Sequence, residues 1–250
     1  MLRQIGLGRQ FKKEADIVLQ LDPHHVGGLN NMMMFYLEAP GVIGGDKAKA
    51  REMADRIMKI DPVQGAFAAL TLAHKEKQTG RDEELLRAAV EARPQSYNAR
   101  ITLAGLLTNQ KKYAEAEKHA REALRLYPDR ASAYGLLAVL AVVQDQWTEV
   151  DSILAQAEKT VPDNFAPYYR VANNCLARKV ELPRAERYLR KYLTMEAEPG
   201  SASHAAAHWR LGLVLEQAGR KAEAVAELET SVKMDGNNAA AKADLKRLKG

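Results

Sequence analysis

Apolar and polar residues alternate along this chain with the period of an amphipathic helix, and prolines end five of the amphipathic segments. These prolines are Pro23, Pro62, Pro94, Pro128 and Pro162. Successive prolines are 39, 32, 34 and 34 residues apart, and several follow similar residues, as in LDP, IDP and LYPD. The recurrence predicts an internal repeat with a period of about 34 residues.

The segment 97–128 shows most clearly what one repeat contains. A first helical pattern continues through Leu107, a polar turn follows, and a second amphipathic stretch starts at about Tyr113. Small residues occupy the faces that would meet, namely Ala104 on the first stretch and Ala116, Ala120 and Ala123 on the second. Because small side chains let two helices approach closely, each repeat is predicted to be a pair of packed helices.

The same pattern extends over the whole chain. It predicts a single domain over residues 1–250, with a partial repeat at 1–23 and a polar capping helix at 240–250. The predicted full repeats are 26–62, 65–94, 97–128, 131–162, 165–197 and 205–236. The run Met32–Met34 lies in the first of these, where helical methionines are typical core residues.

Composition supports an all-α fold. The chain is 46% apolar, 28% charged and 6% aromatic, with 41 alanines, and it lacks the enrichment in β-branched and aromatic residues of a large sheet. These values exclude a disordered chain. The one cysteine, Cys175, cannot form an internal disulfide, and no cysteine–histidine cluster has zinc-binding spacing. Packing alone must therefore stabilise the fold.

The repeat resembles the tetratricopeptide repeat (TPR) family, both in its period and in its small residues at fixed positions, including the pair Leu211–Gly212 and the turn residue Gly219. The resemblance covers nearly the whole chain. It implies a right-handed superhelical solenoid of about six to seven antiparallel helix pairs, with the first helix of each pair lining a concave surface. It further implies a non-catalytic scaffold that binds a protein or peptide partner.

The resemblance also assigns positions to the binding groove. These positions form a neutral wall in which asparagine amides can pair with a peptide backbone, while Tyr169 and Trp209 offer rigid apolar area. They are Asn30, Met34, Ala69, Ala73, Asn98, Ile101, Asn109, Ser132, Val139, Tyr169, Asn173, Trp209 and Leu213, together with Arg210.

The family's best-known peptide site clamps a C-terminal carboxylate with lysine, asparagine and arginine side chains. Only Asn173 and Arg210 fall at matching places here, and Tyr169 stands where the clamp has lysine. Binding of a chaperone tail in this way is therefore not expected. The alternative to a groove contact is that these residues are solvated surface, or touch only neighbouring helices.

The repeat at 26–62 carries extra residues, APGVIGG at 39–45, directly before Asp46, which is predicted to cap the following helix. The segment lacks the spacing of a phosphate-binding loop. Glycine-rich insertions of this kind resemble those in TPR proteins of tripartite periplasmic transporters. That resemblance implies the alternative function, a solute-binding or transporter-accessory protein with an enclosed pocket.

Residues with catalytic or metal-binding potential are few. Known motifs for catalytic nucleophiles, kinases and metalloproteases are absent, so no enzymatic activity and no cofactor are expected. Cys175 faces apolar neighbours and is predicted to be a buried structural thiol. His204 and His208 are four residues apart without a third ligand, so solvent-exposed histidines are expected and not a zinc site.

Charge and hydropathy bear on whether the chain binds nucleic acid or spans a membrane. The net charge is +5, but basic and acidic residues are interleaved along the helices, which makes nucleic-acid binding unlikely. The longest apolar run, 136–143, is too short to span a membrane. The first residues resemble the end of a helix whose beginning is missing. The expected location is the cytoplasm, or the periplasm if an export signal precedes Met1 in a longer protein. The partner and the oligomeric state stay open.

Overall fold

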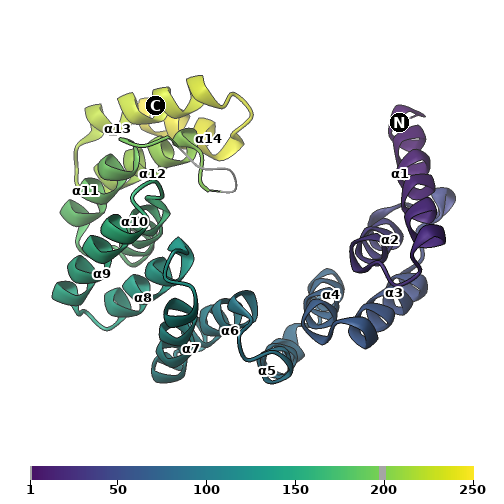
Figure 1. The fold of residues 1–250 in the computed structure, drawn as a ribbon. Coiled ribbons are helices and arrows are strands. Elements are labelled where there is room, and N and C mark those ends of the chain that lie inside the picture. Colours follow the sequence, from purple (N-terminus) through teal and green to yellow (C-terminus); the bar gives the residue numbers. More distant parts are fainter. Residues whose placement is uncertain (1, 197–200) are drawn as a thin grey trace. The chain divides into compact units, whose positions relative to one another are not determined.

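The computed structural model describes residues 2–196 and 201–250, which form helices joined by turns, without a strand among them (Figure 1). The all-α class is therefore confirmed. Backbone contacts divide the chain into two compact units, Met1–Leu106 and Leu107–Gly250. The last helix of the first unit, α6, crosses this boundary by a few residues.

The first unit contains helices in the order that the sequence predicts, with two short 3-10 helices, η1 and η2, between them. The elements are α1 (Leu2–Leu21), α2 (Val26–Glu38), η1 (Gly41–Ile43), α3 (Lys47–Ile60), α4 (Pro62–Lys75), η2 (Thr79–Arg81), α5 (Asp82–Ala92) and α6 (Tyr97–Asn109). Each helix from α1 to α4 packs against the next one. Met32 and Met33 are buried in a core with Leu29 and Ile57, which confirms the core role predicted for these methionines.

The inserted segment before α3 is tightly folded. As predicted, Asp46 caps α3, because its Oδ1 accepts hydrogen bonds from the backbone N–H groups of Ala48 (2.9 Å) and Lys49 (3.2 Å). A Cβ at Gly45 would lie 1.7 Å from the carbonyl oxygen of Ala39, so no side chain fits there. The glycine at this position therefore serves a close backbone contact.

The junction between α3 and α4 differs from the prediction that Pro62 ends a helix. The helix α3 ends at Ile60, and Pro62 is the first residue of α4. Proline suits this place because the first residue of a helix needs no hydrogen-bonded N–H. Asp61 alone separates the two helices, and its carboxylate caps α4 through Val63 N (2.9 Å) and Gln64 N (3.1 Å). The second repeat consequently starts earlier than residue 65.

The second unit continues the pairing of helices. Its elements are α7 (Tyr113–Leu126), α8 (Ala131–Val143), α9 (Trp147–Thr160), α10 (Ala166–Arg178), α11 (Leu182–Tyr192), α12 (His204–Gln217), α13 (Lys221–Met234) and α14 (Ala239–Lys249). We call α8, α10 and α12 the first helices of their pairs, and α7, α9, α11 and α13 the second helices. The helix α14 packs on α13.

Small residues form the seams between helices in this unit. Ala116, Ala120 and Ala123 on α7 are fully buried, as their spacing predicts. Gly212 on α12 plays the same role, since a Cβ there would lie 2.8 Å from Leu228 Cγ on α13. The first helix α8 is enclosed along most of its length, with every residue from Ala133 to Val142 buried. Close approach of the helices thus leaves little of α8 for other contacts, whereas α10 and α12 each keep more residues that are not buried.

Candidate functional site

The predicted groove residues of the first unit lie on the first helices of their pairs. On α2, Asn30 is exposed, whereas Met34 is half-buried against the core. Ile101 on α6 is half-buried, and Asn98 near the start of the same helix is exposed. Ala69 and Ala73 line a hollow of about 450 Å³ between α3, α4 and α5. Asn109, the last residue of α6, is exposed and already belongs to the second unit.

In the second unit the predicted residues differ widely in exposure. Ser132 at the start of α8 is exposed, but Val139 in the middle of that helix is only 7% exposed and offers little surface to a ligand. Tyr169 and Asn173 are half-buried and lie one turn apart on α10. Trp209, Arg210 and Leu213 are half-buried on α12, which contacts α10. The structure therefore brings the predicted residues of α10 and α12 onto neighbouring helices.

Tyr169 packs against one aromatic ring, and a second ring lies beyond that one. Its ring centroid lies 5.2 Å from that of Tyr192 on α11, and the Tyr192 ring lies 6.1 Å from the ring of His204. The Tyr192 hydroxyl donates a hydrogen bond to the carbonyl oxygen of Ala202, and burial raises the pKa of Tyr192. The phenol of Tyr169 has no hydrogen-bond partner among the described residues, so its polar end is available to a ligand.

Trp209 has a structural contact that its sequence position does not reveal. Its indole Nε1 donates a hydrogen bond of 2.9 Å to Asp244 Oδ2 on the cap helix α14. The guanidinium carbon of Arg210 lies 4.1 Å from the Trp209 ring centroid, which is stacking distance. Trp209 thus joins α12 to the cap, and its ring is partly covered by Arg210.

Polar groups without partners gather on the same two first helices. The Asn174 Oδ1 atom on α10 and the Arg210 Nε atom on α12 are buried and make no hydrogen bond. The amide of Asn173 has no hydrogen-bond partner among the described residues either, but it is only half-buried. Buried polar groups ordinarily find partners, so Asn174 and Arg210 are exceptions inside the fold, while the Asn173 amide is the unpartnered group that a ligand can reach.

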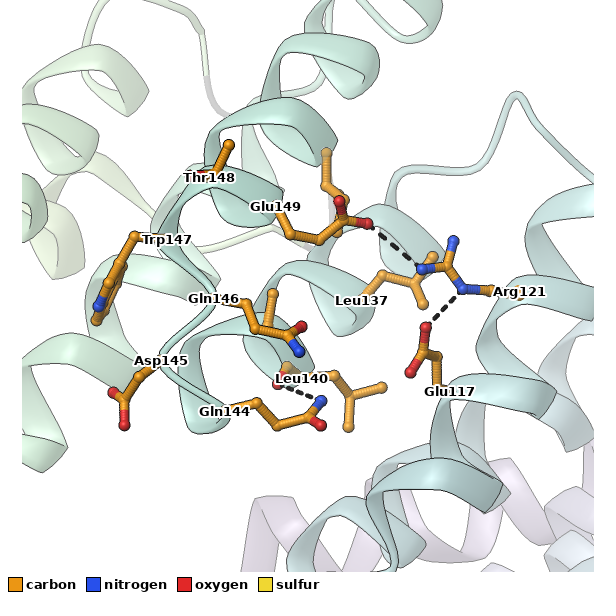
Figure 2. A pocket seen from close by; sticks show the side chains of 12 residues that line it. Glu117, Arg121, Leu137, Leu140, Gln144, Asp145, Gln146, Trp147, Thr148 and Glu149 are labelled. Carbon is orange, nitrogen blue, oxygen red and sulfur yellow. Dashed lines mark hydrogen bonds and ion pairs between the residues drawn. The ribbon is translucent and has the colours of Figure 1, made fainter.

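A hollow of about 510 Å³ lies elsewhere in the second unit, between α7, α8 and α9 (Figure 2). Arg121 bridges two carboxylates at one side, with Nε 2.7 Å from Glu117 Oε1 and Nη2 3.4 Å from Glu149 Oε1. Figure 2 shows the ring of Trp147 at the opposite rim. The lining residues come from α7, α8, α9 and the turn 144–146, and none of them is among the groove positions predicted from the sequence, although Val139 on α8 is a neighbour.

A comparable hollow of about 260 Å³ lies between α9, α10 and α11, and all these hollows are open to solvent. Each is flanked by two successive second helices. Ion pairs cross between those helices at several points in the second unit. They join Arg121 to Glu149, Arg184 to Asp151 (2.5 Å), Lys191 to Glu158 (2.6 Å) and Arg220 to Glu186 (2.5 Å).

The ion pairs shift the ionisation of their carboxyl groups. Partial burial works against ionisation of Asp151, but hydrogen bonds from Arg184 and Tyr188 outweigh it and hold the pKa of Asp151 below its usual range. Hydrogen bonds from Lys191 and Tyr168 likewise lower the pKa of Glu158. Asp151 and Glu158 are therefore matched by basic residues of the same chain.

The histidines at 204 and 208 are not solvent-exposed, and that prediction is wrong. His204 Nε2 lies 2.6 Å from the carbonyl oxygen of Met195, and His208 Nδ1 lies 2.6 Å from Glu227 Oε2. Both rings are half-buried because α12 packs against α11 and α13. Among the described residues, no three histidine, cysteine, aspartate or glutamate side chains are placed to hold a metal ion.

Cys175 is fully buried, as predicted, and burial raises the pKa of its thiol to about 11. The thiol therefore stays protonated at neutral pH and is a poor nucleophile. In the part of the chain that the structure describes, no helix has both the length and the apolar character needed to cross a membrane.

Comparison with protein-family models gives two matches, both described as tetratricopeptide repeat. One covers residues 108–175, and the other covers residues 83–131 and 175–247. The matched residues therefore extend from 83 to 247 and include the helices α10 and α12. None of the curated proteins matches the chain.

Solved structures show the same architecture at low sequence identity. Yeast Tom70 has a TM-score of 0.70 at 15% identity, over 95% of this chain and 50% of that one, so the chain spans half the length of that structure. A tetratricopeptide repeat protein from Parabacteroides merdae has a TM-score of 0.65 at 15% identity, over 96% and 91% of the two chains. PilW, a type IV pilus biogenesis factor, has a TM-score of 0.61 at 16% identity, over 90% and 98%.

Proposed function

Because the chain belongs to the tetratricopeptide repeat family, whose members generally mediate protein–protein interactions, we propose that it is a non-catalytic scaffold that binds an extended segment of a protein partner. The proposed binding surface in the second unit is the exposed side of α10 and α12. Its central residues are Tyr169, Asn173, Trp209 and Arg210.

The observation that carries this proposal is that an amide and a phenol without hydrogen-bond partners, on Asn173 and Tyr169, lie one turn apart on α10 beside the ring of Tyr192. Asn174 Oδ1 and Arg210 Nε are buried without partners, and the Asn173 amide and the Tyr169 hydroxyl also lack them. An extended peptide presents N–H and C=O groups along its whole length. It could therefore pair with the half-buried Asn173 amide and Tyr169 hydroxyl, whereas Asn174 Oδ1 and Arg210 Nε lie below the surface.

Aromatic residues would supply apolar contact area. Tyr169 is held by the ring of Tyr192, so binding would cost little additional side-chain entropy. The stacked pair of Trp209 and Arg210 offers a flat surface to the same ligand. The proposed partner is a segment with apolar side chains at intervals and a free backbone, and not a polyanion.

The alternative function, a solute-binding or transporter-accessory protein, needs an enclosed cavity. The hollows described above are open to solvent. No observation on these surfaces favours the alternative over an open peptide groove, and the resemblance of segment 39–45 to transporter-associated repeat proteins stays a prediction.

The test is a selection of binding peptides from a random displayed library against the whole chain, followed by titration of the best peptide by calorimetry. Tyr169→Ala and Asn173→Ala should each weaken binding at least about tenfold, because they remove an anchor and an amide pair. Gln156→Ala is the matched control, since Gln156 is an exposed amide on the second helix α9.

Salt gives an independent measurement. The contacts proposed for Tyr169 and Asn173 involve uncharged side chains, so affinity should change little between low and high salt. A steep salt dependence, with both variants binding as tightly as the unmodified chain, would contradict the proposal and move binding to the charged second-helix side.

A further inference from the structure

The hollow between α7, α8 and α9, which we call the α7–α9 hollow, has an apolar base and a polar rim. Leu140 of α8 and Ile153 of α9 line it and are almost fully buried. In Figure 2 the side chains of Gln144, Gln146 and Glu149 point across it toward α7. Its volume of about 510 Å³ falls within the usual range of small-ligand pockets, about 300 to 1,000 Å³. One long side chain of a partner would therefore fit inside it.

Carboxylates outnumber basic groups along the rim. The charged lining residues are the acidic Glu117, Asp145 and Glu149 and the basic Arg121. Asp145 has a distant partner outside the lining, Arg178, whose Nη2 atom lies 3.9 Å from its Oδ1. The rim is therefore acidic, although the whole chain has a net charge of +5. A local excess of negative charge attracts a cationic group.

The ion pair across this hollow is looser than the closest pairs between the later second helices. Arg121 Nη2 lies 3.4 Å from Glu149 Oε1, whereas the contacts that join α9 to α11 and α11 to α13 include distances of 2.5 and 2.6 Å. Among the described residues, Glu149 pairs with no other basic group. Its carboxylate therefore keeps most of its capacity to accept hydrogen bonds.

The uncharged groups at the rim favour a ligand that is rich in hydrogen-bond donors. Gln144 donates its Nε2 to the carbonyl oxygen of Leu140 at 3.0 Å, which leaves its Oε1 as an acceptor. The amide of Gln146 has no hydrogen-bond partner among the described residues. A guanidinium group has five N–H donors and no acceptor, and its flat face stacks on aromatic rings. Trp147 lines the hollow and already carries the guanidinium of Arg184, 5.6 Å from its ring centroid.

The corresponding hollow of the first unit has a different chemistry. It lies between α3, α4 and α5, and its lining residue Leu72 precedes Leu140 by 68 residues, which is two repeat periods. Its charged lining residues are balanced, with Arg51 and Arg81 against Asp55 and Glu76. No aromatic residue lines it among the described residues. The repeat thus produces the hollow, and the acidic rim with its tryptophan distinguishes the α7–α9 hollow.

We propose that the α7–α9 hollow binds an arginine side chain of a protein partner. The site is separate from the surface of α10 and α12 and does not depend on peptide binding there. The methylene groups of the bound arginine pack on Leu140 and Ile153, and its guanidinium donates to Glu149 and faces Trp147. Arg121 is then a competitor, because its own guanidinium lies between Glu117 and Glu149.

The first experiment titrates acetyl-arginine amide into the whole chain labelled with nitrogen-15 at tryptophan. The chain has two tryptophans, so the spectrum contains two indole N–H signals, which Trp209→Phe assigns. The Trp147 signal should shift with a dissociation constant of about 1 mM, as expected for a ligand of this size, while the Trp209 signal stays in place. Acetyl-citrulline amide, which has the same shape without the charge, should bind about fivefold more weakly.

The second experiment repeats this titration with variants of the rim. Glu149→Gln should weaken binding about threefold, because the guanidinium loses a charged acceptor. Arg121→Gln should strengthen binding about threefold, because it removes the competing guanidinium and its positive charge. Glu122→Gln is the matched control, since Glu122 is a carboxylate of α7 that does not line the hollow.

Four results would overturn the proposal. The absence of a Trp147 shift far above the expected dissociation constant would mean that the hollow takes no arginine. Equal binding of the citrulline compound would remove the role of charge. Weaker binding by Arg121→Gln would make Arg121 a receptor for an anion. An equal loss from Glu149→Gln and Glu122→Gln would assign the attraction to the overall charge of the unit.

Discussion

Within the second unit, the first and second helices differ in what they do with their polar groups. The second helices bind one another through ion pairs such as Arg184–Asp151 and Lys191–Glu158. The first helices α10 and α12 carry uncharged amides and aromatic rings, together with two buried polar atoms that have no partner. One repeat therefore produces two surfaces, of which one is satisfied internally and the other is not.

This difference shows where binding can gain free energy. A ligand on the second-helix side must compete with existing ion pairs and desolvate charges, which costs about as much as the new contacts return. On the first-helix side a ligand can pair with groups that now lack partners, and each such pair is worth about 1 kcal/mol or more. Stability should thus depend more on one side, and recognition more on the other.

The largest expected effect comes from overpacking the contact between a second helix and its neighbours. Ala116→Leu places extra methylene groups at a fully buried position of α7 and should lower the free energy of unfolding by about 1 to 3 kcal/mol. Ala114→Leu on the same helix is the control, because Ala114 is exposed. Urea denaturation that shows equal stability for the two variants would refute the predicted packing of α7.

The next effect concerns the ion pairs of the second helices. Arg184→Met removes the pair with Asp151 and the stacking of the guanidinium over Trp147, whose centroid is 5.6 Å away, and should cost about 1 kcal/mol. Arg125→Met should cost less, because Arg125 is more exposed and pairs with Glu122 on its own helix. The opposite order in thermal or urea unfolding would mean that pairs between repeats stabilise the fold no more than local ones.

A smaller effect should show what Trp209 contributes to the first-helix side. Trp209→Phe keeps a ring but removes the hydrogen bond to Asp244, so α14 should lose about 0.5 to 1 kcal/mol of local stability. Hydrogen exchange of the α14 amides measures this loss. If Asp244→Ala adds its full effect to that of Trp209→Phe, the two residues do not interact and the hydrogen bond does not hold the cap.

The smallest effect is a dependence on pH. Since the pKa of Glu158 is lowered in the folded chain, its contribution to stability is complete above the ordinary carboxyl pKa and disappears as the pH falls through the lowered value. Between about pH 5 and pH 3, the unmodified chain should therefore lose up to about 0.5 kcal/mol more than Glu158→Gln. Glu91→Gln, at an exposed residue without an ion pair among those described, should show the full loss of the unmodified chain.

Local sequence signals predicted much of this architecture. The spacing of prolines and small residues along the chain predicts the helix pairs and the Ala116–Ala123 seam. An aspartate directly before a helical pattern predicts the Asp46 cap. Pro62 was misplaced because proline suits the start of a helix as well as the end of one. The sequence gives no sign of the left-handed backbone conformations at Lys179 and Glu181, where the φ angles are 56° and 47°.

Contacts between repeats were harder to predict, although the sequence does carry a signal for some of them. Arg184 and Asp151 are 33 residues apart, as are Lys191 and Glu158, and this is almost one repeat period. Opposite charges one period apart therefore indicate an ion pair between successive second helices. The bond from Trp209 to Asp244 spans 35 residues but joins a first helix to the cap, whose packing the repeat does not define.

Asp61 gives the first unit a mechanical property. It is the single residue between α3 and α4, it caps the second of these helices, and its other carboxylate oxygen lies 2.9 Å from Arg93 Nη2 beyond the end of α5. A tensile force along the chain would pass from α3 into α4 without any loop to extend. The segment between α2 and α3, by contrast, holds spare length that can unwind first. Under load, this part of the molecule should therefore lengthen at the insertion, while the α3–α4 joint transmits the force.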